Sequence, residues 1–312
     1  MKLGVRAAGI QAPTAAGVSG TVSTAAQHRF VDFVSLTKPR LNLLVLITTL
    51  AGLYLAAPEG VETALLANTL LGTALVAGGA AALNQVWERR TDALMRRTST
   101  RPIPSGRLKA SEGAWFGLLL SASGLAQLAL AVNTTTAVVA GATLVSYVLV
   151  YTPLKPRTSL ATLVGAVPGA LPPVIGWSAA TGVISLPALV LFGIVFFWQM
   201  PHFLAIAWLF RNDYAHAGIP LLPVVEPDGR RTGLQALIYA AALWPVSLLP
   251  AVIGLAGIPY MIVATALGVL FVWLALRFAR ERSNPNARTL FLFSITYLPI
   301  LLGALVADRL WL

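Results

Sequence analysis

The chain has no cysteine and few charged residues. Its 312 residues include no Cys, and Asp, Glu, Lys and Arg together account for 11% of them. The first absence excludes a disulfide framework, a thiolate metal site and a cysteine nucleophile. The low share of charged residues, together with 57% hydrophobic residues and a mean hydropathy of +0.78, excludes a soluble domain of this size. The composition therefore predicts a polytopic membrane protein.

Several common functional motifs are also missing. The sequence contains no nucleotide-binding glycine loop, no HExxH and no GxSxG. A net charge of +11 is compatible with nucleic-acid binding, but no basic stretch is interleaved with aromatic residues as a nucleic-acid groove would require. We therefore exclude nucleic acid as a partner and look to membrane topology for the origin of the charge.

Nine apolar segments predict an all-α protein with about nine transmembrane helices in one bundle. They cover roughly residues 41–57, 64–84, 114–131, 136–151, 160–178, 186–209, 235–256, 259–279 and 288–307. Residues 1–36 are rich in Ala, Thr, Ser and Gly and are predicted to form a flexible cytosolic arm, with an organelle-targeting segment as the alternative. Residues 37–312 then form a single transmembrane domain.

The basic residues fall almost entirely on one side of these spans. Of the 22 Lys and Arg residues, all except Arg309 lie before the first span or in regions that follow even-numbered spans. The positive-inside rule places these regions and the amino terminus in the cytosol, and the carboxyl terminus outside. The predicted location is a bacterial inner membrane, with a mitochondrial inner membrane as the alternative.

The most informative stretch is residues 84–107, which read NQVWERRTDALMRRTSTRPIPSGR. On a continuing helix, Asn84, Glu88 and Asp92 form one polar stripe, because each step of four residues turns the helix by only about 40°. Mg²⁺ prefers oxygen ligands and often binds through carboxylates and phosphate oxygens, while arginines hold the remaining phosphate charge. The stretch therefore suits a Mg²⁺-bridged polyphosphate. The alternative is a charged cap where a helix meets water.

A second polar segment, YTPLKPRT, ends the fourth span at residues 151–158. Lys155 and Arg157 are placed to reach a diphosphate, and Tyr151 to face a cleft. The alternative is a turn in which basic side chains extend to the membrane surface after a helix-stopping proline.

A third segment lies in and after the sixth span. Gln199 and His202 interrupt an otherwise apolar span, and Asp213 follows it closely. Polar groups inside a membrane are costly and usually face a bundle interior or a cavity. The alternatives are a hydrogen-bonded packing role for His202 and a helix-capping role for Asp213.

The fifth span, VGAVPGALPPVIGW, contains Pro168, Pro172 and Pro173. These prolines predict a kink. The spacing of Gly165 and Gly169 predicts a close approach by a neighbouring helix.

Taken together, these segments resemble the UbiA superfamily of intramembrane prenyltransferases, and within it the haem-farnesylating enzymes. The resemblance covers residues 36 to about 235. It rests on LTKPRLN (36–42), RTSTRPIPSGR (97–107), YTPLKPRT (151–158), VGAVPGALPPVIGW (164–177), WQMPHF (198–203) and DYAHAGIPLLPVV (213–225).

The resemblance implies a reaction and a set of site residues. It implies farnesyl transfer to haem B with release of diphosphate, in a central cleft that opens to the cytosolic side. The catalytic residues implied are Asn84, Glu88, Asp92, Tyr151 and Lys155. The substrate-binding residues implied are Arg96, Arg97, Arg101, Arg157, Gln199, His202, Arg211 and Asp213. The metal is Mg²⁺, with Asn84, Glu88, Asp92 and Asp213 as ligands, and His202 is the candidate haem contact. Farnesyl diphosphate, haem B and the lipid bilayer are the direct partners, and haem A synthase or oxidase assembly proteins are downstream partners.

Two departures from the superfamily pattern affect the metal prediction. The superfamily stripe usually has Asp where this chain has Glu88. The second loop of the superfamily usually has several acids spaced to bind metal, and of these Asp213 alone remains here. A site with two Mg²⁺ ions is therefore in question.

Two other functions remain open from the residues. A relative could prenylate an aromatic quinone precursor, and a haem spectrum of the purified protein would distinguish it. A membrane transporter is the second alternative, but transporter sites usually lie near the midplane. Metal-dependent release of diphosphate would separate an enzyme from a transporter.

The charge asymmetry leads to a topology prediction. Cysteines introduced at Ser105 or Gly229 should resist a membrane-impermeant thiol reagent in intact cells and react in inverted vesicles, because both positions are expected in the cytosol. Labelling from outside the cell would reverse the assigned orientation.

Overall fold

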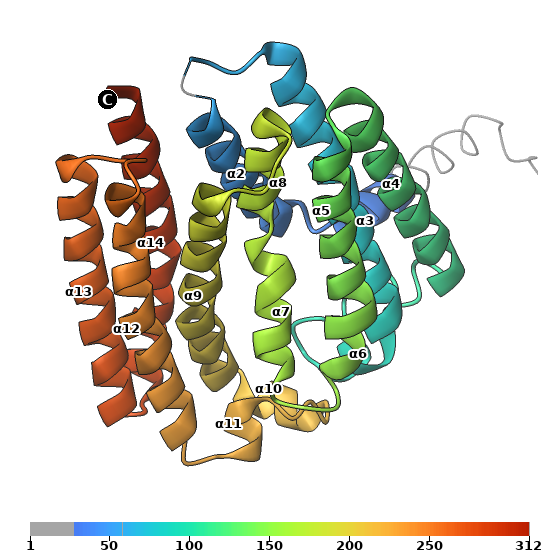
Figure 1. Ribbon diagram of the computed structural model, residues 1–312. Coiled ribbons are helices and arrows are strands. Elements are labelled where there is room, and N and C mark those ends of the chain that lie inside the picture. The colour runs from blue at the N-terminus through green and yellow to red at the C-terminus, as the bar shows by residue number, and fades with distance from the viewer. Residues whose placement is uncertain (1–27, 58, 312) are drawn as a thin grey trace, which may run out of the picture.

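The computed structural model describes residues 28–57 and 59–311, which are helical apart from short connections and contain no strand. The named helices are α2 Pro39–Ala56, α3 Thr63–Leu94, α4 Ala110–Ala131, α5 Thr134–Val145, α6 Thr152–Leu154, α7 Ala161–Ala170, α8 Pro172–Thr181, α9 Leu186–Leu209, α10 Arg211–His216, α11 Leu222–Val225, α12 Arg230–Val252, α13 Ile258–Arg280 and α14 Asn284–Trp311, and a π-helix, η1, covers Ser146–Tyr151. Figure 1 shows the long helices side by side in one bundle.

The predicted number of spans is confirmed for the described residues. Nine helical segments are long and apolar enough to cross a membrane, counting α5 to α6 as one and α7 with α8 as another. The second span runs to Leu94, about ten residues beyond the apolar segment that predicted it. This extension carries the polar stripe, so the stripe does lie on a continuing helix.

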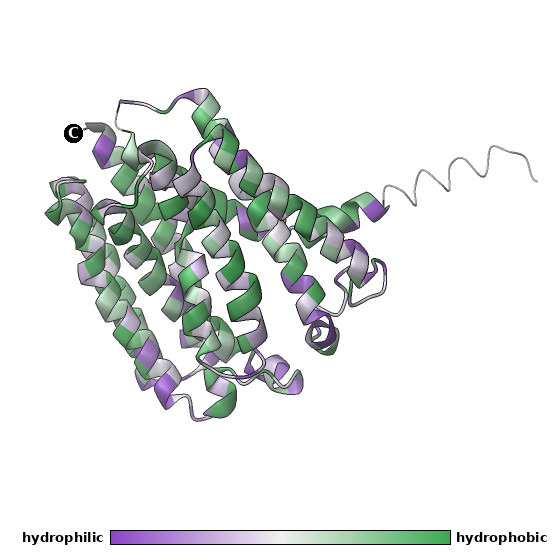
Figure 2. Cartoon of the chain, turned by 45° about the vertical axis from the view of Figure 1, so that its right-hand side comes forward, coloured by the Kyte–Doolittle hydropathy of each residue, from purple (hydrophilic) through white to green (hydrophobic). Residues whose placement is uncertain are grey.

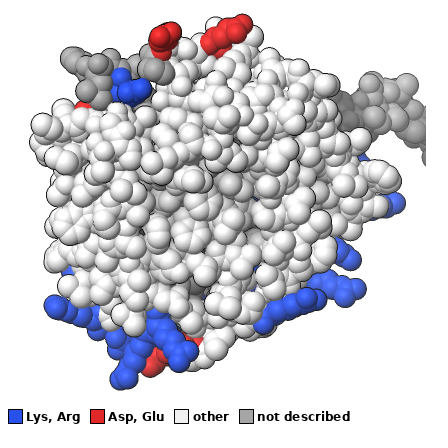
Figure 3. Space-filling view, in the orientation of Figure 1, with Lys and Arg blue, Asp and Glu red and all other residues white. Residues whose placement is uncertain are grey.

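The surface of the bundle matches a membrane environment. Hydrophobic residues cover its sides, and hydrophilic residues concentrate at its two ends (Figure 2). Lys and Arg gather mainly at one end, at the bottom of Figure 3, which we call the basic end. In Figure 1 the short helices α10 and α11 lie at the same end. The segments predicted to carry chemistry therefore share the basic end.

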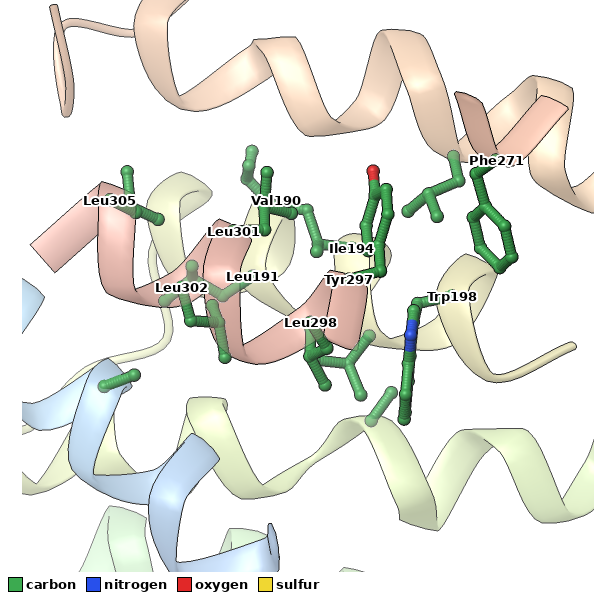
Figure 4. Close-up of a cluster of buried hydrophobic side chains, with 14 of the residues drawn as sticks. Val190, Leu191, Ile194, Trp198, Phe271, Tyr297, Leu298, Leu301, Leu302 and Leu305 are labelled. Carbon is green, nitrogen blue, oxygen red and sulfur yellow. The ribbon is translucent and has the colours of Figure 1, made fainter. Parts of the chain in front are cut away.

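Large buried side chains pack α9 and α13 against α14. Ile194, Phe271 and Tyr297 are fully buried there, among the leucines labelled in Figure 4. The Tyr297 hydroxyl is hydrogen-bonded to Ser247 on α12 at 3.0 Å, so its polar atom is satisfied within the apolar core. This packing fixes α9 relative to the last three spans, which form a scaffold for the basic end.

Helices α2 and α8 approach each other closely through two glycines. A β-carbon at Gly52 would overlap the carbonyl of Pro173, and one at Gly176 would overlap the carbonyl of Thr49. The contact is therefore backbone to backbone, as small residues allow in membrane proteins. It holds the first span against the fifth.

The fifth span is interrupted at Leu171, where the prolines predicted a kink. Pro172 begins α8, because proline is tolerated in the first turn of a helix. The two glycines of α7 make room mainly for side chains. A β-carbon at Gly165 would meet the ring of Tyr151 at 2.6 Å, and Gly169 lies directly against the side chain of Gln199.

The predicted amino-terminal arm is described only from His28 onward, and residues 1–27 lie outside the described residues. Residues 28–36 form a helix that packs on the start of α4. Arg29 pairs with Glu112 at 2.6 Å, and Phe33 lies 5.1 Å from Phe116 between ring centroids. This part of the predicted arm is therefore helical and leads into α2.

Candidate active site

The polar stripe of α3 is buried. Asn84, Glu88 and Asp92 are 2%, 8% and 0% exposed, although each carries a polar or charged side chain. An exposed helix cap would leave these groups in water. Buried charges require partners, because removing a carboxylate from water without one is costly.

Each member of the stripe is paired with a basic side chain from a different segment. Lys38 donates to Asn84 Oδ1 at 2.9 Å, Lys155 donates to both oxygens of Glu88 at 2.9 and 3.0 Å, and Arg101 donates to Asp92 Oδ2 at 2.6 Å. These cations come from the residue before α2, the turn after α6 and the loop after α3. Three parts of the chain therefore converge on one face of α3.

The surroundings shift the pKa values of both lysines. Burial lowers the pKa of Lys38 to about 8, and repulsion from Arg101 adds to this effect. Burial also opposes the charge on Lys155, but the Glu88 carboxylate, which accepts its hydrogen bonds, outweighs burial and raises the pKa of Lys155 above its usual range. Both ammonium groups are therefore charged at neutral pH.

A π-helix places two tyrosines beside the stripe. In η1, the rings of Tyr147 and Tyr151 stack with centroids 5.4 Å apart. π-helical turns are rare and often occur at functional sites. Nothing in the sequence predicts η1, because no residue pattern distinguishes a π-helix from an ordinary helix.

Thr152 connects η1 to the stripe and orients Asn84. Its hydroxyl donates to the Tyr147 carbonyl at 2.8 Å and accepts a hydrogen bond from Asn84 Nδ2 at 3.2 Å. The amide oxygen of Asn84 is thereby directed toward Lys38, an assignment that rests on this hydrogen-bond network. The oxygen is thus held in position to contact a cation.

The loop after α9 lies against the loop after α3. The guanidinium of Arg97 lies 4.7 Å from the ring centre of Tyr214 and 5.3 Å from that of Phe210. Tyr214 is 7% exposed and belongs to the same buried cluster as Met95. The first and third segments predicted to carry chemistry therefore meet directly. The ion pair between Lys155 and Glu88 also brings the first and second segments together.

The stripe has the donor set that one Mg²⁺ requires. It offers two carboxylates and an amide oxygen, and Asp92 Oδ1 is buried without a hydrogen-bond partner in the described part of the chain. Such an orphaned oxygen is a suitable metal ligand.

Within residues 28–57 and 59–311, no three His, Cys, Asp or Glu side chains form a metal-binding group. Asp213 therefore does not join Glu88 and Asp92 as predicted. The short helix α10 turns Tyr214 inward and leaves Asp213 partly exposed.

Three other predicted residues lie along other helices. Gln199 donates to the Ala166 carbonyl of α7 at 2.7 Å, and His202 Nδ1 lies 2.7 Å from Ser294 Oγ of α14. Arg211 donates to Asn284 Oδ1 at the start of α14 at 3.0 Å. Of the remaining arginines, Arg96 and Arg157 are exposed.

Lys38 is the site residue that sequence reasoning missed. It belongs to LTKPRLN, one of the segments that carried the resemblance, but no role was assigned to it. The available signal was a lysine directly before the proline that begins a span.

The sequence matches known proteins over most of its length. The family model described as UbiA prenyltransferase family matches residues 45–297. The chain is 45% identical over 287 residues to a protein of Solibacter usitatus, covering 89% of this chain and 98% of that one. It is 47% identical over 280 residues to one of Myxococcus xanthus, covering 89% and 94%. Both relatives are named protoheme IX farnesyltransferase.

Solved structures show the same fold. A structure described as that of digeranylgeranylglyceryl phosphate synthase aligns with a TM-score of 0.79 at 17% identity, covering 91% of this chain and all of the other. A UbiA homolog from Archaeoglobus fulgidus, bound to GPP and Mg²⁺, aligns with a TM-score of 0.64 at 15% identity, covering 90% of this chain.

The buried stripe, Arg101 and Lys155 lie within the segment that the family model matches, and the nine-span bundle is the fold of these structures. The chain belongs to the UbiA prenyltransferase family.

Proposed function

We propose that this chain transfers the farnesyl group of farnesyl diphosphate to a vinyl group of haem B, forming haem O and releasing diphosphate. The observation that carries the proposal is 43–47% identity to bacterial proteins named protoheme IX farnesyltransferase, over 88–94% of the chain. The buried stripe and its cations support a diphosphate substrate.

The diphosphate would bind at the stripe. Lys155 and Arg101 would donate to its oxygens and stabilise the negative charge that develops as the bond between C1 and the leaving oxygen breaks. Arg96, Arg97 and Arg157 would hold the outer charge. A Mg²⁺ held by Asn84, Glu88 and Asp92 would neutralise part of the diphosphate charge. The Archaeoglobus fulgidus homolog with GPP and Mg²⁺ supports a metal in the family.

When the C1–oxygen bond breaks, diphosphate leaves with the electron pair and the farnesyl group would remain as an allylic cation. The stacked rings of Tyr147 and Tyr151 lie beside Lys155 and present electron-rich faces that would stabilise this cation. A vinyl carbon of haem B then forms the new carbon–carbon bond with farnesyl C1. Water adds to the resulting cation next to the porphyrin and loses a proton, which gives the hydroxyethylfarnesyl side chain.

His202 and Arg211 are the proposed haem contacts, and the hydrogen bonds around His202 support this role. Ser294 donates its hydroxyl proton to the Phe291 carbonyl at 2.6 Å, so His202 Nδ1 must donate to Ser294 Oγ. Nε2 then carries the free lone pair of the imidazole. A histidine that ligates a metal has this tautomer, with its other ring nitrogen held by a hydrogen bond. Arg211, near the start of α14, would pair with a haem propionate.

The proposed location is a bacterial inner membrane with the basic end in the cytosol. The concentration of Lys and Arg at that end supports this orientation by the positive-inside rule. Farnesyl diphosphate would then reach the stripe from a cleft open to the cytosol. Haem O would be passed to haem A synthase or to oxidase assembly proteins.

The reaction can be tested directly. Membranes that contain the chain, incubated with haem B, farnesyl diphosphate and Mg²⁺, should yield a porphyrin with the mass of haem O, while membranes without it should not. Absence of this product, with prenylation of an added aromatic quinone precursor instead, would reject the haem proposal.

The stripe predicts a large loss of turnover when Asp92 is changed. Asp92→Asn keeps the size of the side chain and its hydrogen bond to Arg101, but removes the charge beside the metal. We expect turnover to fall by about 10²- to 10³-fold, as for the loss of one group that stabilises developing charge. Haem O formation and Mg²⁺ dependence are measured together.

Asp228→Asn is the matched control for Asp92→Asn. Asp228 forms an exposed ion pair with Arg230 at 3.5 Å, and such pairs contribute little. Its turnover should stay near that of the wild type. Near-normal turnover of Asp92→Asn at saturating Mg²⁺ would remove the metal role from the stripe.

His202 predicts a selective loss of haem binding. His202→Leu preserves an apolar fit beside Trp198 and Phe291, so a packing role should tolerate it, whereas an iron contact should not. Haem B titration followed by the Soret band should show weaker binding, while affinity for a farnesyl diphosphate analogue stays unchanged. His216→Leu, at an exposed position in α10, is the control. If haem binding survives in His202→Leu, the haem contact must be sought elsewhere.

A further inference from the structure

A short helix precedes the first span and packs beside α4. Residues 28–36 form this helix, which we call the amino-terminal helix. Phe33 contacts Phe116 of α4, and Leu36 is fully buried in a cluster that includes Leu108. One face of the amino-terminal helix is therefore committed to packing against α4 and against the loop between α3 and α4.

Two ion pairs connect the same helix to that loop and to the first turn of α4. Asp32 accepts a hydrogen bond from Nε of Arg107 at 3.0 Å, and Arg29 donates to Glu112 at 2.6 Å. Arg101, which pairs with the polar stripe of α3, belongs to the same loop. The amino-terminal helix therefore braces the segment that supplies one of the cations of the site.

The face opposite Asp32 is apolar and exposed. A helix turns by about 100° per residue, so the residues two positions before and after Asp32 lie about 160° away from it. These residues are Phe30 and Val34, which are 69% and 41% exposed, and Val31 at the edge of this face is 58% exposed. We call these three residues the outer face. A contiguous exposed apolar patch of this kind marks an interaction site.

The surroundings place the outer face at a membrane surface. The amino-terminal helix contacts α4 at Glu112 and Phe116, and Trp115, which lies between them in the sequence, is 68% exposed. Exposed tryptophans of membrane proteins concentrate at the boundary between acyl chains and headgroups. The start of α2 also exposes Leu41 and Leu43, at 67% and 58%. Apolar surface therefore continues along the chain from the outer face into the first span.

Basic side chains lie close to this helix in the structure and in the sequence. Arg40 and Lys109 are exposed, at the start of α2 and directly before α4, and they add to the two arginines of the ion pairs. Cations beside an apolar helix face are attracted by anionic lipid headgroups, and helices of this type lie in the plane of the interface. The chemistry matches a bilayer, with acyl chains for the outer face and phosphates for the cations.

We propose that the amino-terminal helix is a membrane-surface anchor whose outer face inserts into the anionic leaflet at the basic end. Because its other faces pack on α4 and pair with Arg107, this contact also holds the loop of residues 95–109 beside the polar stripe. The inference requires only a membrane-embedded bundle, so it goes beyond the proposed reaction and does not depend on it.

The position of the outer face can be measured with single labels, because the chain has no cysteine. Cysteine replaces Phe30, Val34 or Ser35, and an environment-sensitive fluorophore is attached in vesicles of phosphatidylcholine and phosphatidylglycerol. Labels at Phe30 and Val34 should be quenched by lipids with a quencher on the acyl chain and protected from aqueous acrylamide. Ser35 is exposed and lies only about 60° from Asp32, so its label is the control and should show the reverse.

The double variant Phe30→Asp with Val34→Asp tests whether the membrane contact braces the loop. Carboxylates on the outer face should withdraw it from the bilayer, because they are costly among acyl chains and are repelled by anionic headgroups. Backbone hydrogen exchange of residues 95–109, measured by mass spectrometry in the same vesicles, should rise several-fold while exchange of α13 stays unchanged. Ser35→Asp is the matched control and should leave exchange of both segments as in the wild type.

Three results would overturn the inference. Strong acrylamide quenching of the labels at Phe30 and Val34 would place the outer face in water. Protection of these labels from both quenchers would show that protein, such as a second copy of the chain, covers the outer face in place of lipid. Unchanged exchange of residues 95–109 in the double variant, or an equal rise in α13, would reject the bracing of the loop.

Discussion

The structure depends on neutralising a polar stripe inside a membrane protein. Two carboxylates and an amide on α3 are almost completely buried, and each would be costly without a partner. The partners come from three segments, so the residue before α2, the loop after α3 and the turn after α6 must all approach one face of one helix. The same requirement that stabilises the fold assembles a cationic site beside oxygen ligands.

The other features of the basic end support that arrangement. The π-helix turns Tyr147 and Tyr151 toward the stripe, and Gly165 of α7 leaves room for the Tyr151 ring. Arg97 holds the loop after α9 through the faces of Tyr214 and Phe210. Meanwhile α9 is fixed from the other side by the apolar core that it shares with α13 and α14 (Figure 4). Rigid helices thus hold the polar groups, and short loops supply the cations.

His202 and the stripe illustrate two ways of placing a polar group in a span. The stripe residues are neutralised by charged partners, whereas His202 is anchored by one hydroxyl and surrounded by aromatic rings. Under the proposed function, the first environment would bind the charged diphosphate and the second would bind the haem, a large apolar ring system with a metal at its centre.

Local properties of the sequence determined the membrane class, the nine spans, the interruption of the fifth span and the spacing of the stripe, because hydropathy, proline and helical periodicity act over a few residues. Only the tertiary structure shows which cation contacts which stripe residue and that Lys38 is one of these cations. It also shows that Asp213 does not join Glu88 and Asp92, and that His202 faces α14. These outcomes depend on contacts between residues far apart in the chain, such as 46 positions for Lys38 with Asn84 and 67 for Lys155 with Glu88. No local pattern specifies such a pairing, because it is set by how whole helices pack.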